Sequence, residues 1–184
     1  SLAERRGRIT AEEARALGVA HVYAPVADVN VNPDNPVINA RSFGEDPADV
    51  TRYVVATVKG IQDGGALATI KHFPGHGDTA TDSHRSLPVL RFDRKRLDAV
   101  ELVPFRAGIA AGARSVMVAH LAVPSLDATP APPLVAPERN EVFKADVTEV
   151  EAAGTLPATL SPALTDGLLR KELGFDGLVV TDSM

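Results

Sequence analysis

The chain has 184 residues, which is enough for one domain with a substantial core and too few for two large domains. Hydrophobic residues make up 45% of it, yet no run approaches the roughly 18–20 consecutive apolar residues of a membrane span, so the composition indicates a soluble globular protein. A net charge of −5 with no basic block argues against a nucleic-acid-binding surface.

Short apolar runs and helical patterns alternate along the chain. The apolar runs end where polar residues begin, which is typical of buried strands that lead into loops. The expected helices span about 10–17, 47–63, 93–111 and 161–173, and the expected strands span about 21–24, 66–70, 115–119 and 178–181.

Single residues mark where these helices are expected to begin. Thr10 opens the first helix as the cap of a capping box, and Pro47 stands near the first position of the second. Asp93 opens the third helical region, which Pro104 is expected to interrupt. Ser161 caps the fourth helix.

The repeated helix–strand order predicts a parallel α/β fold. In such folds ligands bind at the carboxyl ends of the strands, where 23–28, 71–84, His120 and Asp182 all fall. A (β/α)8 barrel takes about 250 residues. We therefore predict that residues 1–184 form part of a (β/α)8 TIM-like barrel. Consecutive strands outside a closed barrel leave two open sheet edges, through which the chain could associate with itself.

Two long segments interrupt the pattern. Residues 25–47 form a loop longer than about 12–15 residues, which in a compact domain is usually either functional or disordered. Apolar residues within this loop indicate that it is ordered. Residues 130–155, with bounds that are approximate, are rich in proline and charge and show no apolar helix face. We interpret them as an insertion or a lid.

Polar side chains gather in residues 71–84, immediately after the second expected strand. Asp82 and His84 are two residues apart, so the carboxylate can accept the proton of one imidazole nitrogen and leave the other nitrogen to move protons. A surface ion pair is the alternative for these two residues. Lys71 and His72 stand at the mouth of the strand and could donate hydrogen bonds to a polyhydroxylated ligand, although Lys71 could also be a surface lysine.

Two further side chains are candidates for the same site. Asp182 follows the last expected strand, where its carboxylate could be a nucleophile or the N-cap of a following helix. Arg41 lies in the long loop 25–47 and could bind an anion or a ligand hydroxyl, or pair with Glu45 or Asp46.

A long histidine motif makes a family resemblance specific. It reads Lys71-His72-Phe73-Pro74-Gly75-His76-Gly77 and is followed by Asp82-Ser83-His84. Further matching stretches are Ala24–Asn30, Asn35–Ile38, Arg41–Gly44, Leu156–Ser161 and Gly174–Asp182. In these stretches the chain resembles family 3 glycoside hydrolases, in their β-N-acetylhexosaminidase branch. An early Asp-Gln-Glu-Gly-Gly segment of that family has no counterpart in this sequence.

The resemblance implies a retaining glycoside hydrolase that removes terminal β-linked N-acetylglucosamine. The family uses an aspartate nucleophile, an acid/base histidine paired with an aspartate, and several sugar-binding side chains. The matching catalytic residues are Asp182, His84 and Asp82, and the matching substrate-binding residues are Lys71, His72 and Arg41. The resemblance implies a carbohydrate substrate, such as a muropeptide-derived N-acetylglucosaminide in bacterial peptidoglycan recycling, with no cofactor and no metal.

Three other functions stay open. The protein could be a β-glucosidase of the same family, or an inactive carbohydrate-binding fragment. It could also be a metal-dependent hydrolase, although no His-Glu-x-x-His spacing supports one. The metal ligands would then be His72, His76, His84, Asp78 and Asp82. The first residues lack the apolar core of a signal peptide, which favours a cytoplasmic over a secreted protein, while the absence of cysteine leaves the compartment open.

Overall fold

The computed structural model describes residues 1–79, 87–131 and 154–183, and within them the chain forms a four-stranded parallel sheet with helices. The strands, adjacent in sequence order, are β1 (His21–Val22), β2 (Leu67–Phe73), β3 (Ser115–Val118) and β4 (Leu178–Thr181). The helices are α1 (Leu2–Ala16), η1 (Asn39–Arg41), α2 (Pro47–Asp63), α3 (Arg94–Ala99), α4 (Leu102–Ala110), η3 (Ala158–Leu160) and η4 (Ala163–Glu172). Parallel strands in sequence order with helices between them are part of a (β/α)8 barrel, so the predicted fold class is confirmed.

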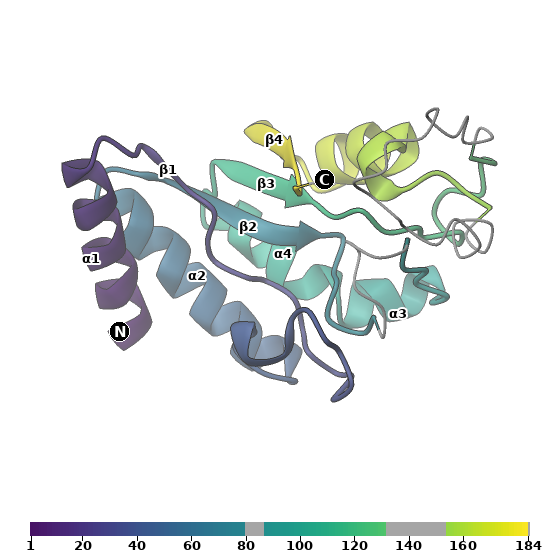
Figure 1. The fold of residues 1–184 in the computed structure, drawn as a ribbon, viewed down its shortest axis with the longest axis horizontal. Helices are drawn as coiled ribbons and strands as arrows, with labels where there is room; N and C mark the ends of the chain where they lie inside the picture. The colour runs from purple at the N-terminus through teal and green to yellow at the C-terminus, as the bar shows by residue number, and fades with distance from the viewer. Residues whose placement is uncertain (80–86, 132–153, 184) are drawn as a thin grey trace, which may run out of the picture.

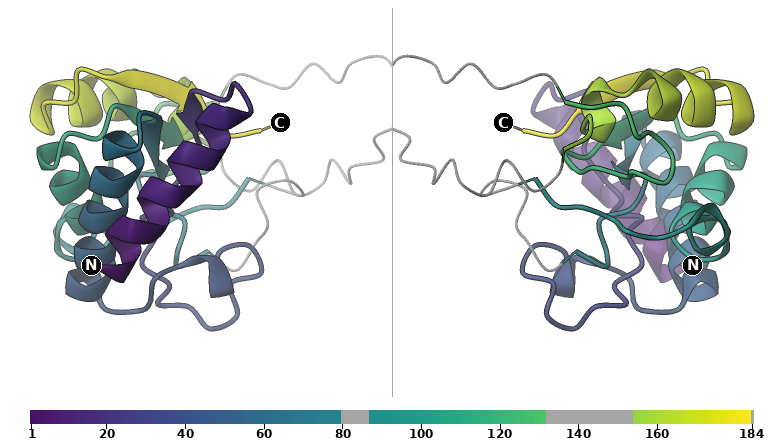
Figure 2. Two further views of the ribbon diagram at one scale, coloured as in Figure 1. Left: turned by 90° about the vertical axis from the view of Figure 1, so that its left-hand side faces the viewer. Right: turned by 90° about the vertical axis from the view of Figure 1, so that its right-hand side faces the viewer.

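The helices cover one face of the sheet (Figure 1). Figure 2 shows α1, α2, α4 and η4 following one another around this outer face, and α1 lies directly against α2. Apolar side chains from both layers form one buried cluster, in which Val54 of α2, Ile70 of β2, Phe105 of α4 and Val116 of β3 are fully buried. This cluster holds the strands rigidly and so fixes the positions of the loops at their carboxyl ends.

The helix α2 begins and ends where the sequence predicts. The Asp46 side chain caps it by accepting hydrogen bonds from the N–H groups of Ala48 and Asp49, and Pro47 occupies the first position. Gly64 follows its last residue. Its buried apolar residues, Val50, Val54, Val58 and Ile61, recur at helical spacing. Because the cap, the proline and this spacing are all local signals, the helix could be predicted from the sequence alone.

The first and third helical regions differ from the prediction. Ser1, rather than Thr10, caps α1, in a capping box with Glu4. The helix extends back to Leu2 because this part packs closely on α2: a Cβ added at Gly7 would lie 2.7 Å from the Thr57 carbonyl oxygen. The third region is interrupted before Pro104, at residues 100–101, and Pro104 lies within the first turn of α4, where proline is tolerated.

The strand β2 continues to Phe73, three residues further than predicted, so Lys71 and His72 belong to the strand itself. Lys71 also pairs with Val26 of the long loop, and the Ala27 N–H donates to the Lys71 carbonyl at 2.6 Å. The loop 25–47 is thereby held along the end of β2. The expectation that this loop is ordered is confirmed.

The predicted insertion at about 130–155 lies mostly outside the described residues. Its flanks pair with each other: the Ala131 N–H donates to the Gly154 carbonyl at 3.0 Å, and Leu156 N–H donates to the Thr129 carbonyl at 3.0 Å. The chain therefore leaves and re-enters the fold at one place. Its role as an insertion or lid stays a prediction.

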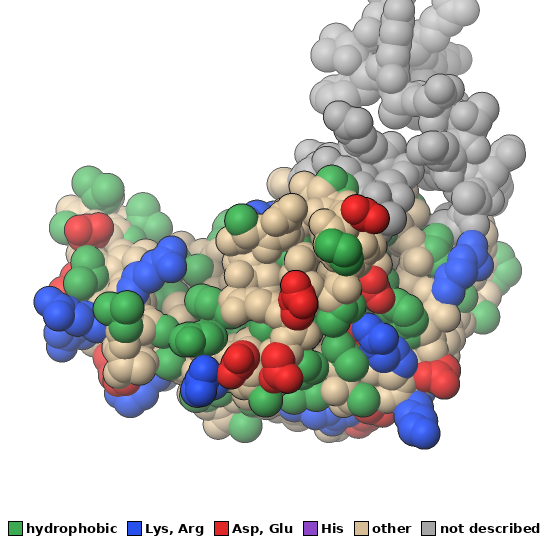
Figure 3. All heavy atoms as spheres, turned by 90° about the horizontal axis from the view of Figure 1, so that it is seen from below, with side chains coloured by type: hydrophobic (Ala, Val, Ile, Leu, Met, Phe, Trp, Pro, Cys, Tyr) green, Lys and Arg blue, Asp and Glu red, His purple; other side chains and the backbone are tan. Residues whose placement is uncertain are grey.

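The helix-bearing side of the molecule carries acidic and basic side chains interspersed among apolar ones (Figure 3). An ion-pair network on this side joins Arg94 and Asp98 of α3 to Arg106 of α4 and Glu172 of η4. Among the described helices, none is long and apolar enough to cross a membrane.

The open edges of the two outer strands predict that the isolated chain associates with itself. Within the described residues β1 and β4 each pair on one side only. Tyr23, which directly follows β1, is 53% exposed, and Leu178, the first residue of β4, is 48% exposed. Because open edges offer unpaired backbone groups, we expect the isolated 184-residue chain to form dimers or larger assemblies at micromolar concentration in sedimentation experiments. A monomer that unfolds cooperatively would contradict this expectation. The complete protein, measured alongside, serves as the control.

Candidate active site

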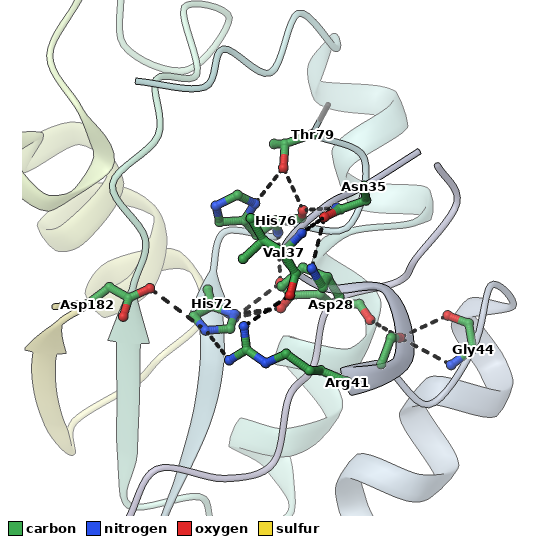
Figure 4. Close-up of polar contacts among 11 residues, drawn as sticks. Asp28, Asn35, Val37, Arg41, Gly44, His72, His76, Thr79 and Asp182 are labelled. Atoms are coloured by element: carbon green, nitrogen blue, oxygen red, sulfur yellow. Dashed lines mark hydrogen bonds and ion pairs between the residues drawn. The ribbon is translucent and has the colours of Figure 1, made fainter. Parts of the chain in front are cut away.

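Four of the six predicted site residues are described, and they converge at the carboxyl end of the sheet. Lys71 and His72 lie near the carboxyl end of β2, Asp182 directly follows β4, and Arg41 ends η1 in the long loop. The His72 Nε2 atom lies 3.8 Å from Asp182 Oδ2 and 3.4 Å from Arg41 Nη2 (Figure 4). Three segments that are far apart in the sequence thus meet around one imidazole.

The other two predicted residues, Asp82 and His84, lie outside the described residues. The structure describes the histidine motif as far as Thr79 and resumes at Leu87. The acid/base assignment of Asp82 and His84 therefore stays a prediction.

A buried carboxylate, Asp28, holds His72 in place, and the sequence pattern did not mark it as a site residue. Asp28 is fully buried beyond β1, and its Oδ2 atom lies 2.7 Å from His72 Nδ1. Its Oδ1 atom accepts hydrogen bonds from the backbone N–H groups of His72 at 3.1 Å and His76 at 2.7 Å. Burial by itself raises the pKa of Asp28, but interaction with His72 and these hydrogen bonds outweigh it and hold the pKa below its usual value.

The Asp28 carboxylate also decides which nitrogen of His72 faces the site. A carboxylate only accepts hydrogen bonds, so the network assigns a proton to Nδ1 of His72. The Nε2 atom then faces the guanidinium of Arg41, which only donates. Arg41 is oriented by a second bond, from Nη1 to the Val37 carbonyl at 3.2 Å. The ring and the guanidinium are therefore held before any ligand arrives.

Lys71 and Asp182 add opposite charges to this group. Burial and the nearby charge of Arg41 lower the pKa of Lys71, while Asp182 and Asp28 act in the opposite direction, so these three charges all lie close to Lys71. The Asp182 side chain is 18% exposed, and its Oδ1 atom accepts a hydrogen bond from the Ser183 N–H at 2.8 Å. Its carboxylate is thus oriented and still accessible to a ligand.

The turn after β2 is built around His76. The His76 Nδ1 atom lies 2.6 Å from Thr79 Oγ1, and the Thr79 hydroxyl donates to the His76 carbonyl at 3.0 Å. That carbonyl also accepts from the Asn35 side chain at 2.8 Å (Figure 4). Burial lowers the pKa of His76, which favours its neutral form. His76 therefore shapes the loop, and Asn35 and Thr79 are supporting residues that the sequence did not reveal.

Gly77 allows this turn to cross the long loop. A Cβ atom added at Gly77 would lie 1.9 Å from the Val29 carbonyl oxygen, so any larger residue would push the two segments apart. The motif therefore contains glycine here because two backbones touch, which brings Asp28 and His72 within reach of each other.

The metal-dependent alternative finds no support among the described residues, which contain no group of three or more His, Asp or Glu side chains arranged to hold a metal ion. His72 and His76 each direct Nδ1 to another protein group, Asp28 and Thr79 respectively. Of the other three residues of the proposed ligand set, Asp78 pairs with Arg96 at 3.5 Å, and His84 and Asp82 lie outside the described part.

Comparisons with known proteins agree on one family. The model of the family described as "Glycosyl hydrolase family 3 N terminal domain" matches residues 1–184. Beta-hexosaminidase A of Pseudoalteromonas piscicida is 40% identical over 174 residues, which are 94% of this chain and 27% of that protein. Beta-hexosaminidase of Stenotrophomonas maltophilia (strain K279a) is 38% identical over 184 residues, which are 100% of this chain and 46% of that protein.

A solved structure leads to the same family. The glycoside hydrolase family 3 beta-N-acetylglucosaminidase from Paenibacillus sp. str. FPU-7 superposes with a TM-score of 0.82 and 45% identity, over 98% of this chain and 30% of that one. The chain therefore spans less than half the length of each of these relatives.

Proposed function

This chain belongs to the N-terminal domain of glycosyl hydrolase family 3, and on that basis we propose that the complete protein is a retaining glycoside hydrolase. It removes terminal β-linked N-acetylglucosamine or a related hexosamine. The observation that carries the proposal is the convergence of Asp182, His72 and Arg41 at the carboxyl end of a parallel sheet, in a chain similar to β-hexosaminidases.

The described residues suit a sugar. Lys71 and Arg41 offer charged donors, and hydrogen bonds to charged groups are stronger than those between neutral groups. A sugar hydroxyl that takes the place of Arg41 at the Nε2 atom of His72 can donate to this atom, because Asp28 fixes the proton on Nδ1. A ring hydroxyl can both donate and accept, so one sugar can satisfy all three side chains. In this proposal Lys71, His72 and Arg41 bind the substrate.

The chemistry follows a double displacement. Asp182 attacks the anomeric carbon while protonated His84 gives its proton to the leaving oxygen, so the glycosidic C–O bond breaks and an ester to Asp182 forms. Neutral His84 then takes a proton from water, the water oxygen attacks the anomeric carbon, and the ester to Asp182 breaks. Asp82 orients the His84 ring. Two inversions give net retention, with a histidine in place of the acid carboxylate that most retaining glycosidases use.

The preference of the complete protein between two sugar substrates tests this proposal. We expect the specificity constant kcat/KM for 4-nitrophenyl N-acetyl-β-glucosaminide to exceed that for the matching glucoside by about 10²-fold or more, because a site that binds the acetamido group leaves polar groups unpaired with glucose. The measurement is initial release of nitrophenol, repeated after treatment with a chelator, which should leave the rate unchanged.

Each alternative predicts a different result of this assay. Equal or faster hydrolysis of the glucoside would point to a β-glucosidase. A loss of activity with the chelator that zinc restores would identify a metal-dependent hydrolase. Binding of N-acetylglucosamine with no turnover by the complete protein would identify a carbohydrate-binding protein. Any of these results would overturn the proposal.

A further inference from the structure

A third histidine reaches the site from β3. His120 follows this strand, and its ring lies between two segments that are distant in the sequence. Its Nε2 atom is 3.1 Å from the backbone carbonyl oxygen of Asp182, and its Nδ1 atom is 3.1 Å from the Thr159 hydroxyl. The ring therefore connects the ends of β3 and β4 with the short helix η3.

These two contacts agree with one tautomer of His120. A carbonyl oxygen only accepts hydrogen bonds, so Nε2 must carry the proton that it donates to Asp182. In the neutral ring Nδ1 is then an acceptor, and the Thr159 hydroxyl can donate to it. The Asp182 carbonyl thus fixes the tautomer of His120, and the Thr159 hydroxyl, which can either donate or accept, satisfies the other ring nitrogen.

The Thr159 hydroxyl is presented from a fixed segment. The N–H of Ala158 donates to the carbonyl of Leu121 at 2.7 Å, immediately beside His120. On the other side, the Ser161 hydroxyl donates to the Asp127 carboxylate, and both of these residues are buried. Hydrogen bonds on either side of Thr159 therefore hold η3 against the end of β3.

The Asp182 backbone is held from two directions. Its N–H donates to the Val118 carbonyl at 3.0 Å, and its own carbonyl accepts from His120. Together these bonds fix the peptide groups on either side of the Asp182 Cα atom. The Asp182 side chain extends from this Cα atom and places Oδ2 3.8 Å from Nε2 of His72, one of the residues proposed to bind the sugar.

We propose that His120 is a positioning residue for Asp182: it orients the attacking carboxylate through the backbone, and Thr159 holds the ring in place through its other nitrogen. The role rests on the function proposed above, in which Asp182 is the nucleophile. Attack on the anomeric carbon requires a carboxylate oxygen in line with the leaving group, and a misplacement of about 1 Å can cost about 10²-fold in rate.

The test measures how fast Asp182 becomes esterified in the complete protein. The probe is a 5-fluoro-N-acetylglucosaminyl fluoride, in which the ring fluorine slows both steps and the fluoride leaving group lets the ester accumulate. His120→Leu is expected to lower the rate of ester formation at Asp182 by about 10–100-fold. His120→Gln offers an amide N–H from a similar position and should keep the rate within about fivefold of wild type. Thr159→Val keeps the His120 ring, and its rate of ester formation should lie between the rates of His120→Leu and His120→Gln.

A second histidine–threonine pair in the same sheet provides the matched control. The His21 Nε2 atom lies 2.6 Å from Thr69 Oγ1, at the amino end of the strands and away from Asp182. His21→Leu should lower the melting temperature and leave the rate of ester formation unchanged. A purely structural role of His120 would give the same pattern as His21, and that result would overturn the inference.

Failure of the inference and failure of the proposed function are distinguishable. If the wild-type protein forms its ester on a carboxylate other than Asp182, the proposed function is wrong and the role of His120 falls with it. If wild type is labelled at Asp182 but His120→Leu is labelled equally fast, only the positioning role is wrong. Should His120→Leu fail to fold, Thr159→Val decides: a wild-type rate in that variant would overturn the inference.

Discussion

Replacing Asp182 with alanine is expected to abolish hydrolysis by the complete protein, with a loss in kcat of about 10⁴-fold or more, because no ester can form without the attacking carboxylate. The structure supports this choice of residue. Asp182 is partly exposed at the carboxyl end of β4, its backbone is held by Val118 and His120, and its side chain points at His72 (Figure 4).

The role of Asp182 can be read from the stereochemistry of a rescued reaction. With an activated aryl N-acetyl-β-glucosaminide and sodium azide, the alanine variant should form the α-glycosyl azide, because azide enters through the space that the carboxylate vacates. Nuclear magnetic resonance of the anomeric proton distinguishes this product from the β-azide. Asp176→Ala, an exposed aspartate just before the other end of β4, is the control and should retain wild-type hydrolysis. A β-azide, or no effect of the alanine, would exclude Asp182 as the nucleophile.

Elements whose signals are local could be predicted from the sequence. The bounds of α2 follow from Asp46, Pro47 and Gly64, and the bounds of β4 from a short apolar run that Asp182 ends. The start of α1 could not be predicted in this way. Thr10 has the form of a cap, but contact between Gly7 and α2 makes the preceding residues helical as well, and that contact exists only in the folded chain.

The same distinction applies to the site. Lys71, His72 and Asp182 could be expected together because the carboxyl ends of parallel strands meet at one edge of a sheet. The side chains that orient these residues could not be predicted from the sequence. Asp28 contacts the Nδ1 atom of His72, and Thr159 contacts the Nδ1 atom of His120. The residues next to Asp28 and Thr159 in the sequence do not predict these contacts. Only the fold shows that Asp28 is buried between two backbone N–H groups and an imidazole.

Asp28 is therefore the residue whose replacement is expected to cost most in stability among the supporting residues. In Asp28→Asn one oxygen becomes an N–H donor, which would face the N–H groups of His72 and His76 or the Nδ1–H of His72, so at least one buried donor loses its partner. We expect a loss of about 3 kcal/mol in the free energy of unfolding of the complete protein at pH 7. The kcat/KM for the N-acetyl-β-glucosaminide should fall by about 10–100-fold, because His72 is no longer held.

The pH dependence of the unfolding free energy tests whether the negative charge of Asp28 causes this difference in stability. The pKa of Asp28 is lowered in the folded protein, so its contribution to stability is fully present above the ordinary carboxyl value of 3.8 and is lost as the pH falls through the lowered folded value. Urea unfolding of wild type and Asp28→Asn should therefore differ by a constant amount from pH 7 to about pH 5, and by progressively less below about pH 4.

Asp98→Asn is the matched control for this experiment. Asp98 also pairs with positive groups, Arg94 and Arg106, but it is partly exposed at the surface, where water screens the charges. This variant should lose under about 1 kcal/mol and keep wild-type kcat/KM. If Asp28→Asn were as stable as Asp98→Asn, or if its deficit persisted unchanged at pH 3, the buried carboxylate would not be what holds His72 toward Asp182. The orientation of that ring would then have to come from Arg41 and Asp182, which lie near its Nε2 atom.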